Sequence, residues 1–156
     1  EEADQTDMIT VWVAITDATQ DNGCLKVIPG KHKKMLPHCP KTQTAIADGW
    51  INEADAKALP VKAGSLVILH PLIPHASLPN HTNGFRWSFD LRYNVTGQPT
   101  GRSHFPDFIA YSQSQPERVL QDWKEWRGLW ETARRKLSNG EHIPIHRWQS
   151  DAPFCA

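Results

Sequence analysis

The sequence predicts a mainly β domain of the α+β class, formed by a jelly-roll or cupin-like barrel and one carboxy-terminal helix. Three observations predict this class. Short apolar segments rich in β-branched and aromatic residues alternate with turn residues in the amino-terminal part of the chain. A segment with helical periodicity follows them. The strands also lie close together in sequence, which favours a barrel or a jelly roll.

Several segments are predicted to be strands. Residues 8–16 (MITVWVAIT) have apolar side chains in both phases, as expected for a buried strand. An Asn-Gly turn separates them from residues 24–28, and we expect the two segments to form a β-hairpin with a long loop. Residues 64–70 and 85–93 are predicted strands on either side of a Pro-rich loop that carries a histidine.

The helix is predicted at residues 114–139. Residues 114–117 (SQPE) have the form of a capping box with a proline in the first turn. Apolar residues then recur at three- and four-residue steps and form one stripe. The stripe consists of Val119, Trp123, Trp126, Trp130, Ala133 and Leu137. We expect it to pack against the outside of the barrel. Residues 140–156 are predicted to be an irregular tail, so that residues 1–156 form a single domain.

Composition argues against several classes of partner. The 17 basic and 17 acidic residues balance, so charge favours neither nucleic acid nor an anionic membrane. No stretch approaches the roughly 20 apolar residues that span a bilayer. Cys24, Cys39 and Cys155 are an odd number without CxxC spacing, which argues against a disulfide scaffold and a structural zinc site. We therefore predict a cytoplasmic protein, while the oligomeric state is left open.

The candidate site centres on His75 and Arg86. His75 leaves one predicted strand and Arg86 enters the next, so the two side chains would lie on facing walls of a small barrel. A neutral imidazole can hold a divalent metal, and a guanidinium can bind a carboxylate through two parallel hydrogen bonds. The pair suggests an iron enzyme with a carboxylate cosubstrate. Two alternatives stay open: His75 bonds a backbone carbonyl, or Arg86 pairs with an ordinary carboxylate such as Asp90.

The other histidines are interpreted as structural or surface residues. His70 precedes His75 by a spacing unlike that of standard zinc pairs. A proline between His142 and His146 prevents the helical turn that would place both on one face. His32 is interpreted as a turn-stabilising residue. One histidine alone does not complete the 2-His-1-carboxylate triad of non-haem iron oxygenases.

Three blocks of the sequence resemble the phytanoyl-CoA dioxygenase family. They are residues 11–15 (VWVAI), 21–30 (DNGCLKVIPG) and 75–80 (HASLPN), of which the middle block is the most specific. The resemblance covers essentially the whole chain. It implies a double-stranded β-helix, which is a jelly-roll core, and Fe(II)- and 2-oxoglutarate-dependent oxygenase chemistry.

The resemblance also assigns roles to five residues. His75 corresponds to the distal iron ligand, and Arg86 corresponds to the residue that binds the distal carboxylate of 2-oxoglutarate. Ser77 and Trp12 match positions that line the cosubstrate pocket, and Ser88 assists Arg86. These residues hold iron and cosubstrate, and no residue of the chain is assigned a catalytic proton transfer.

The chain departs from the family in one respect. The family supplies its two other iron ligands from a His-x-Asp motif shortly before the strand predicted at residues 8–16. No histidine precedes His32 in this sequence. We therefore expect the motif to lie upstream of Glu1. The chain would then be the carboxy-terminal part of a longer oxygenase and would be inactive alone.

The activity that the resemblance implies is hydroxylation of a small organic or acyl substrate by dioxygen, with release of succinate and CO2. Residues 31–60 would face the barrel mouth and set specificity, because loops on a rigid scaffold usually do so. Two other classes stay open. One is a non-catalytic cupin-like module that binds a small anionic ligand through Arg86. The other is an interaction protein that uses the tryptophan stripe.

Overall fold

The computed structural model describes residues 6–40, 44–100, 105–140 and 151–155. The strands are β1 (Met8–Ala14), β2 (Leu25–Val27), β3 (His38–Pro40), β4 (Thr44–Ile46), β5 (Lys57–Leu59), β6 (Leu66–Leu69), β7 (His75–Ser77) and β8 (Ser88–Asn94). The helices are the 3-10 turns η1 (Glu53–Asp55), η2 (Pro116–Arg118) and η3 (Pro153–Cys155) and the α-helix α1 (Trp123–Asn139). Short strands followed by one α-helix are the order that the sequence predicts.

Backbone contacts divide the chain into two compact units, which is a finer division than the single predicted domain. The barrel unit comprises Met8–Tyr93 and Trp148–Ala156. The helix unit comprises Glu1–Asp7 and Asn94–Arg147. The candidate site residues all belong to the barrel unit, so the site can be described within that unit alone.

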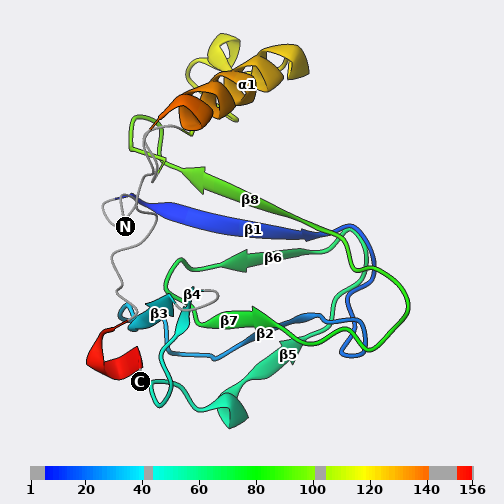
Figure 1. The fold of residues 1–156 in the computed structure, drawn as a ribbon. Helices are drawn as coiled ribbons and strands as arrows, with labels where there is room; N and C mark the ends of the chain where they lie inside the picture. The colour runs from blue at the N-terminus through cyan, green and yellow to red at the C-terminus, as the bar shows by residue number, and fades with distance from the viewer. Residues whose placement is uncertain (1–5, 41–43, 101–104, 141–150, 156) are drawn as a thin grey trace. The chain divides into compact units, whose positions relative to one another are not determined.

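Most strands of the barrel unit belong to two three-stranded sheets, ordered β6-β1-β8 and β5-β2-β7, and β3 pairs with β4 (Figure 1). In the first sheet β1 is antiparallel to β6, with Trp12 opposite Val67. In the second sheet β2 lies between β5 and β7 and is antiparallel to both, with Val27 opposite His75. The histidine therefore enters the structure at the beginning of a sheet-edge strand.

The predicted hairpin of residues 8–16 and 24–28 is wrong, because β1 and β2 lie in different sheets. Residues 15–24, between the two strands, instead connect one sheet to the other. Ala18 forms an isolated bridge with Val61, and the Asn22 side chain donates a hydrogen bond to the Asp17 carbonyl at 2.8 Å. A change of sheet between consecutive strands is a feature of jelly rolls.

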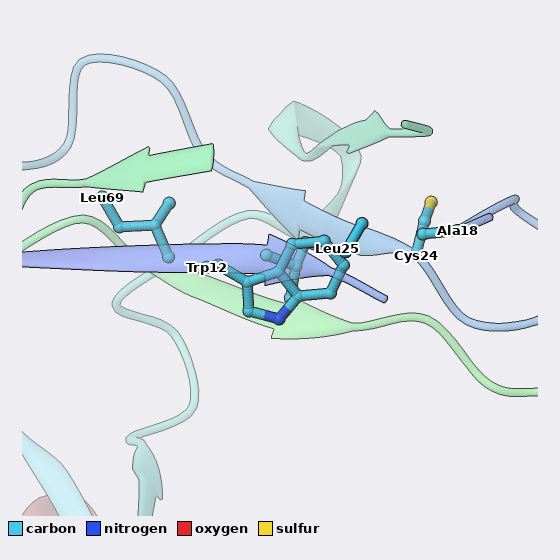
Figure 2. Close-up of a cluster of buried hydrophobic side chains, with 6 residues drawn as sticks. Trp12, Ala18, Cys24, Leu25 and Leu69 are labelled. Atoms are coloured by element: carbon cyan, nitrogen blue, oxygen red, sulfur yellow. The ribbon is translucent and has the colours of Figure 1, made fainter. Parts of the chain in front are cut away.

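The apolar core contains side chains from both sheets (Figure 2). Its buried members are Trp12, Ala14, Ala18, Cys24, Leu25 and Leu69. Trp12 and Leu69 come from the β6-β1-β8 sheet, and Leu25 comes from β2. Burial of such side chains is the main favourable contribution to folding. The core therefore joins the two sheets and fixes the strands that carry the site.

The α-helix begins at Trp123, later than the sequence predicts. The predicted capping box forms only the short turn η2, because Val119 is extended and ends it. The true N-cap is Asp122, whose side chain accepts a hydrogen bond from the Lys124 amide at 2.8 Å. Within the helix unit Ala133 is buried, whereas Trp123 is 62% exposed. The packing of this helix on the barrel stays a prediction.

A disulfide between Cys39 and Cys155 corrects the inference from the odd cysteine count. It joins β3 to η3 across a sequence separation of 116 residues. Cys24 is the free cysteine and is buried in the core. An odd number of cysteines leaves room for one bridge, and the chain fold, not the local spacing, brings this pair together. No helix in the described part of the chain has the length and apolar character needed to cross a bilayer.

Candidate active site

A cavity of about 310 Å³ in the barrel unit brings the candidate residues together. Its lining consists of Trp12, Leu25, Leu69, His75, Ala76, Ser77, Arg86, Ser88 and Asp90. All five residues assigned from the sequence belong to this set. The volume lies at the lower end of the range for small-molecule pockets, about 300–1,000 Å³. The cavity is therefore large enough for a compact organic acid.

Strand geometry explains which side chains reach the cavity. Side chains that are two residues apart in a strand lie on the same face. His75 and Ser77 therefore share one face of β7. Arg86 lies two residues before β8, and Ser88 and Asp90 continue the two-residue steps at the beginning of that strand. Two short polar rows from two different sheets meet across the cavity.

The Arg86 guanidinium is held in place by neutral groups. Its Nη2 donates a hydrogen bond to Ser77 Oγ at 3.0 Å, and its Nη1 donates one to Ser88 Oγ at 3.2 Å. The guanidinium carbon lies 5.2 Å from the ring centroid of Trp12, in the geometry of a cation–π contact. The side chain is thus oriented by contacts that do not neutralise its charge.

No carboxylate forms an ion pair with Arg86 among the residues that the structure describes. The alternative that Arg86 pairs with Asp90 is therefore wrong, although Asp90 lines the same cavity. A half-buried cation without an anionic partner is costly unless a ligand supplies the anion. The guanidinium presents a planar set of donors that suits a carboxylate. The chemistry of this end of the cavity is therefore suited to an anionic group.

The His75 ring has a defined orientation. Its Nδ1 lies 2.9 Å from the backbone carbonyl oxygen of Ile73. A carbonyl only accepts hydrogen bonds, so Nδ1 carries a hydrogen, and in the neutral tautomer with this hydrogen bond the lone pair is on Nε2. Histidines that bind metals commonly have such a second hydrogen bond. The carbonyl bond weighed as an alternative role is thus present, and it is compatible with a role of Nε2 as a metal ligand.

The described residues offer one evident metal ligand at this site. No group of three or more His, Cys, Asp and Glu side chains lies close enough to hold a metal ion in the described ranges. His32 and His70 are near each other, with ring centroids 5.1 Å apart, and His70 Nδ1 accepts a hydrogen bond from the Leu72 amide. His142 and His146 lie outside the described residues.

Sequence reasoning did not assign Leu25 and Leu69 to the site, and it named Asp90 only as a possible partner of Arg86. Leu25 and Leu69 form apolar wall, and Asp90 adds a carboxylate. A signal for Asp90 was present, because it follows Arg86 and Ser88 in the same two-residue alternation. The leucines gave no such signal, since an inward-facing leucine on a strand is usually core.

Comparison with known proteins places this geometry in a family. A model of the phytanoyl-CoA dioxygenase family matches residues 2–88, more than half of the 156 residues. The chain belongs to this family. The matched range includes every residue assigned to the site.

Two curated relatives and one solved structure illustrate the range of similarity. The peroxisomal phytanoyl-CoA dioxygenase of Mus musculus is 36% identical over 154 residues, covering 88% of this chain and 44% of that protein. The methylphosphonate hydroxylase of Gimesia maris is 30% identical over 97 residues, covering 62% of this chain and 37% of that protein. The chain thus spans less than half the length of these relatives.

The solved structure is that of the non-heme monooxygenase ThoJ in its apo form. It is 23% identical, with a TM-score of 0.61, and the match covers 87% of this chain and 56% of that chain. At this identity the likeness concerns the fold. It confirms the predicted fold class, a mainly β jelly-roll core with a carboxy-terminal helix.

Proposed function

We propose that the protein is a non-haem Fe(II)- and 2-oxoglutarate-dependent dioxygenase, to which this chain contributes the cosubstrate clamp and one iron ligand. Its reaction would hydroxylate a small organic or acyl substrate with dioxygen and release succinate and CO2. The observation that carries the proposal is the Arg86 guanidinium, which faces the same cavity as His75 and pairs with no carboxylate of the described residues. Family membership supports the same reaction.

Each site residue has a defined task in this reaction. Arg86 binds the distal carboxylate of 2-oxoglutarate through its free donors, while Ser77 and Ser88 hold the guanidinium in position. Trp12 is 3% exposed and forms an apolar wall that keeps water from the clamp. His75 offers Nε2 to iron. When bound, Fe(II) supplies the activation of dioxygen that couples decarboxylation of 2-oxoglutarate to hydroxylation.

The donor set fits iron only in part. His75 is a suitable ligand, but a facial triad needs a second histidine and a carboxylate. We propose that the whole protein supplies these from a His-x-Asp motif outside this chain. Strands β7 and β8 are each at the edge of a sheet, so backbone groups beside the cavity are available for further strands. It follows that the 156-residue chain alone should have no turnover.

A second candidate function rests on the same cavity. A cupin-like module could bind a small dicarboxylate through Arg86 without any redox metal. The single evident ligand among the described residues favours it. The two candidates differ in one measurable property, because only the dioxygenase forms succinate in an iron-dependent reaction.

The test is succinate formation from 2-oxoglutarate by the whole protein with Fe(II). We expect His75→Ala to abolish it, because the metal loses a ligand. Arg86→Ala should raise the KM for 2-oxoglutarate about 30-fold or more, since removal of one partner of a desolvated charge pair costs at least ~2 kcal/mol. Arg135→Ala is the matched control, because Arg135 lies on α1 and bonds Thr132. Iron-independent binding without succinate would support the module instead.

A further inference from the structure

Hydrogen bonds connect the His70 side chain to the His75 ring through the segment between β6 and β7. His70 Nδ1 accepts a hydrogen bond from the Leu72 amide at 3.1 Å. The Ile73 amide donates a hydrogen bond to the His70 carbonyl at 3.0 Å, which closes a four-residue β-turn. The Ile73 carbonyl is also the group that lies 2.9 Å from His75 Nδ1. The turn that begins at His70 therefore ends at the residue that orients His75.

The apolar part of this turn is anchored in the barrel. A proline follows His70, and a second proline follows Ile73, and each of them restricts the residue before it to extended backbone. The second of these, Pro74, is buried, and its carbonyl accepts a hydrogen bond from the Ile28 amide at 3.0 Å. Ile73 is partly buried against the apolar core. The exposed part of the turn has no such packing and depends on local hydrogen bonds.

The Leu72 amide is the point at which the turn depends on a histidine. Leu72 is half-buried, and the acceptor of its amide within the described ranges is the His70 ring. A partly buried amide that loses its acceptor is costly. The His32 ring lies against that of His70 with centroids 5.1 Å apart, a spacing typical of aromatic pairs. This contact restricts the rotation of the exposed His70 imidazole and keeps Nδ1 directed at the Leu72 amide.

We propose that His70 is a positioning residue, which holds the Ile73 carbonyl where it selects the Nδ1–H tautomer of His75. This inference rests on the proposed function in one respect, because the tautomer matters for the reaction only if Nε2 of His75 binds iron. An imidazole whose other nitrogen has a fixed partner presents its lone pair in one direction. His70 itself does not line the cavity, so it acts through the turn and not through contact with cosubstrate.

The experiment measures the tautomer of His75 from its ring nitrogen chemical shifts in NMR spectra of the 156-residue chain. The spectra are recorded at about pH 8, above the ordinary histidine pKa of about 6.5. We expect His70→Ala to lower the ratio of Nδ1–H to Nε2–H about fivefold, the shift that corresponds to one ordinary hydrogen bond. His81→Ala is the matched control and should keep the wild-type ratio, because His81 bonds the Asp21 carbonyl through its backbone amide.

His70→Asn separates the turn bond from the histidine ring. An asparagine side chain commonly accepts a hydrogen bond from the amide two residues later, so this variant should restore the wild-type ratio. A serine forms the same bond more weakly, so His70→Ser should give an intermediate ratio, and it replaces His70→Ala if that variant does not fold.

Two results would overturn the proposal. One is a wild-type ratio in the folded His70→Ala variant, or in the folded His70→Ser variant that replaces it. The other is a ratio in His70→Asn as low as that in His70→Ala, or no higher than that in His70→Ser where serine replaces alanine. The measurement needs neither iron nor succinate formation, so its failure leaves the dioxygenase proposal standing, and failure of the dioxygenase proposal leaves the measured tautomer unchanged.

Discussion

The core and the cavity of the barrel unit share Trp12, Leu25 and Leu69, but their other members differ in kind. The core adds small buried apolar side chains, whereas the cavity adds an imidazole, a guanidinium, two hydroxyls and a carboxylate. The core gains stability from closed packing. The cavity leaves a cation without an anionic partner among the described residues, at a cost in stability. The same three side chains thus contribute to the folded core and to the lining of the candidate site.

Substitution of a residue that belongs to both the core and the cavity should lower the stability of the fold and weaken ligand binding. Trp12→Ala removes a 3% exposed indole from the core and the ring beneath the Arg86 guanidinium. We expect a loss of about 3–5 kcal/mol in the free energy of unfolding and weaker binding of 2-oxoglutarate by the folded fraction. Urea unfolding and a binding titration measure the two effects. Weakened binding without lost stability would show that Trp12 is not a core residue.

Removal of the disulfide should affect stability and leave the cavity intact. Cys39 and Cys155 do not line it, and their bridge closes a loop of 116 residues. We expect Cys39→Ser to lower the free energy of unfolding by about 2–5 kcal/mol, and reduction of the wild-type chain to have the same effect. The variant itself should not respond to reductant. If the free energy of unfolding of the wild-type chain were the same with and without reductant, the bridge would not form in solution.

A substitution in the helix unit should leave the cavity unaffected. Trp126 is 45% exposed, and its ring contacts that of Trp130 edge-on with centroids 6.5 Å apart. We expect Trp126→Ala to cost about 1–2 kcal/mol, less than a fully buried indole, with 2-oxoglutarate binding unchanged. Thermal unfolding and the binding titration measure both quantities. Lost binding would mean that the helix unit supports the site.

The smallest expected effect is at Asp17. The Ala63 amide and then Lys62 hold the pKa of its carboxyl below the ordinary value of 3.8, and the Lys62 ammonium lies 2.9 Å away. A lowered pKa gives stability that is present above the ordinary carboxyl range and is lost as pH falls through the folded-state pKa. Asp17→Asn should therefore be slightly less stable than wild type near neutral pH, and the difference should shrink in acid. If the difference in unfolding free energy between wild type and Asp17→Asn did not change with pH, its cause would be packing and not the charge of Asp17.

Local patterns predicted the longer strands but missed the three-residue strands β3, β4, β5 and β7, of which β7 lies in a segment predicted to be a Pro-rich loop. β1, β2 and β6 fall within predicted segments, and β8 extends one residue beyond its predicted segment, because their β-branched and aromatic runs are long enough to be recognised. Trp12, His75 and Arg86 meet in one cavity, as expected from the resemblance. Their roles as iron ligand and clamp stay proposals, and the geometry of the cavity is compatible with them.

Two of the failures share a physical cause, which is that they depend on distant parts of the chain. The β1–β2 hairpin was expected from turn chemistry, but β1 finds its partner in β6 and β2 finds its partners in β5 and β7. The Cys39–Cys155 bridge likewise depends on where the carboxy-terminal tail returns. The helix start failed locally, because the capping box at residues 114–117 competes with a stronger cap at Asp122.

The central proposal is that the Arg86 guanidinium, which forms no ion pair with a carboxylate of the described residues, recognises the distal carboxylate of 2-oxoglutarate. The direct measurement compares binding of 2-oxoglutarate and 2-oxopentanoate, which has a methyl group in place of that carboxylate, by NMR titration of the 156-residue chain. Wild type and the Arg135→Ala control should prefer 2-oxoglutarate about tenfold or more, the value of a charge-assisted hydrogen bond. Arg86→Ala should bind both acids equally weakly. If Arg86→Ala kept the wild-type preference, another residue would be the clamp and the account would be wrong.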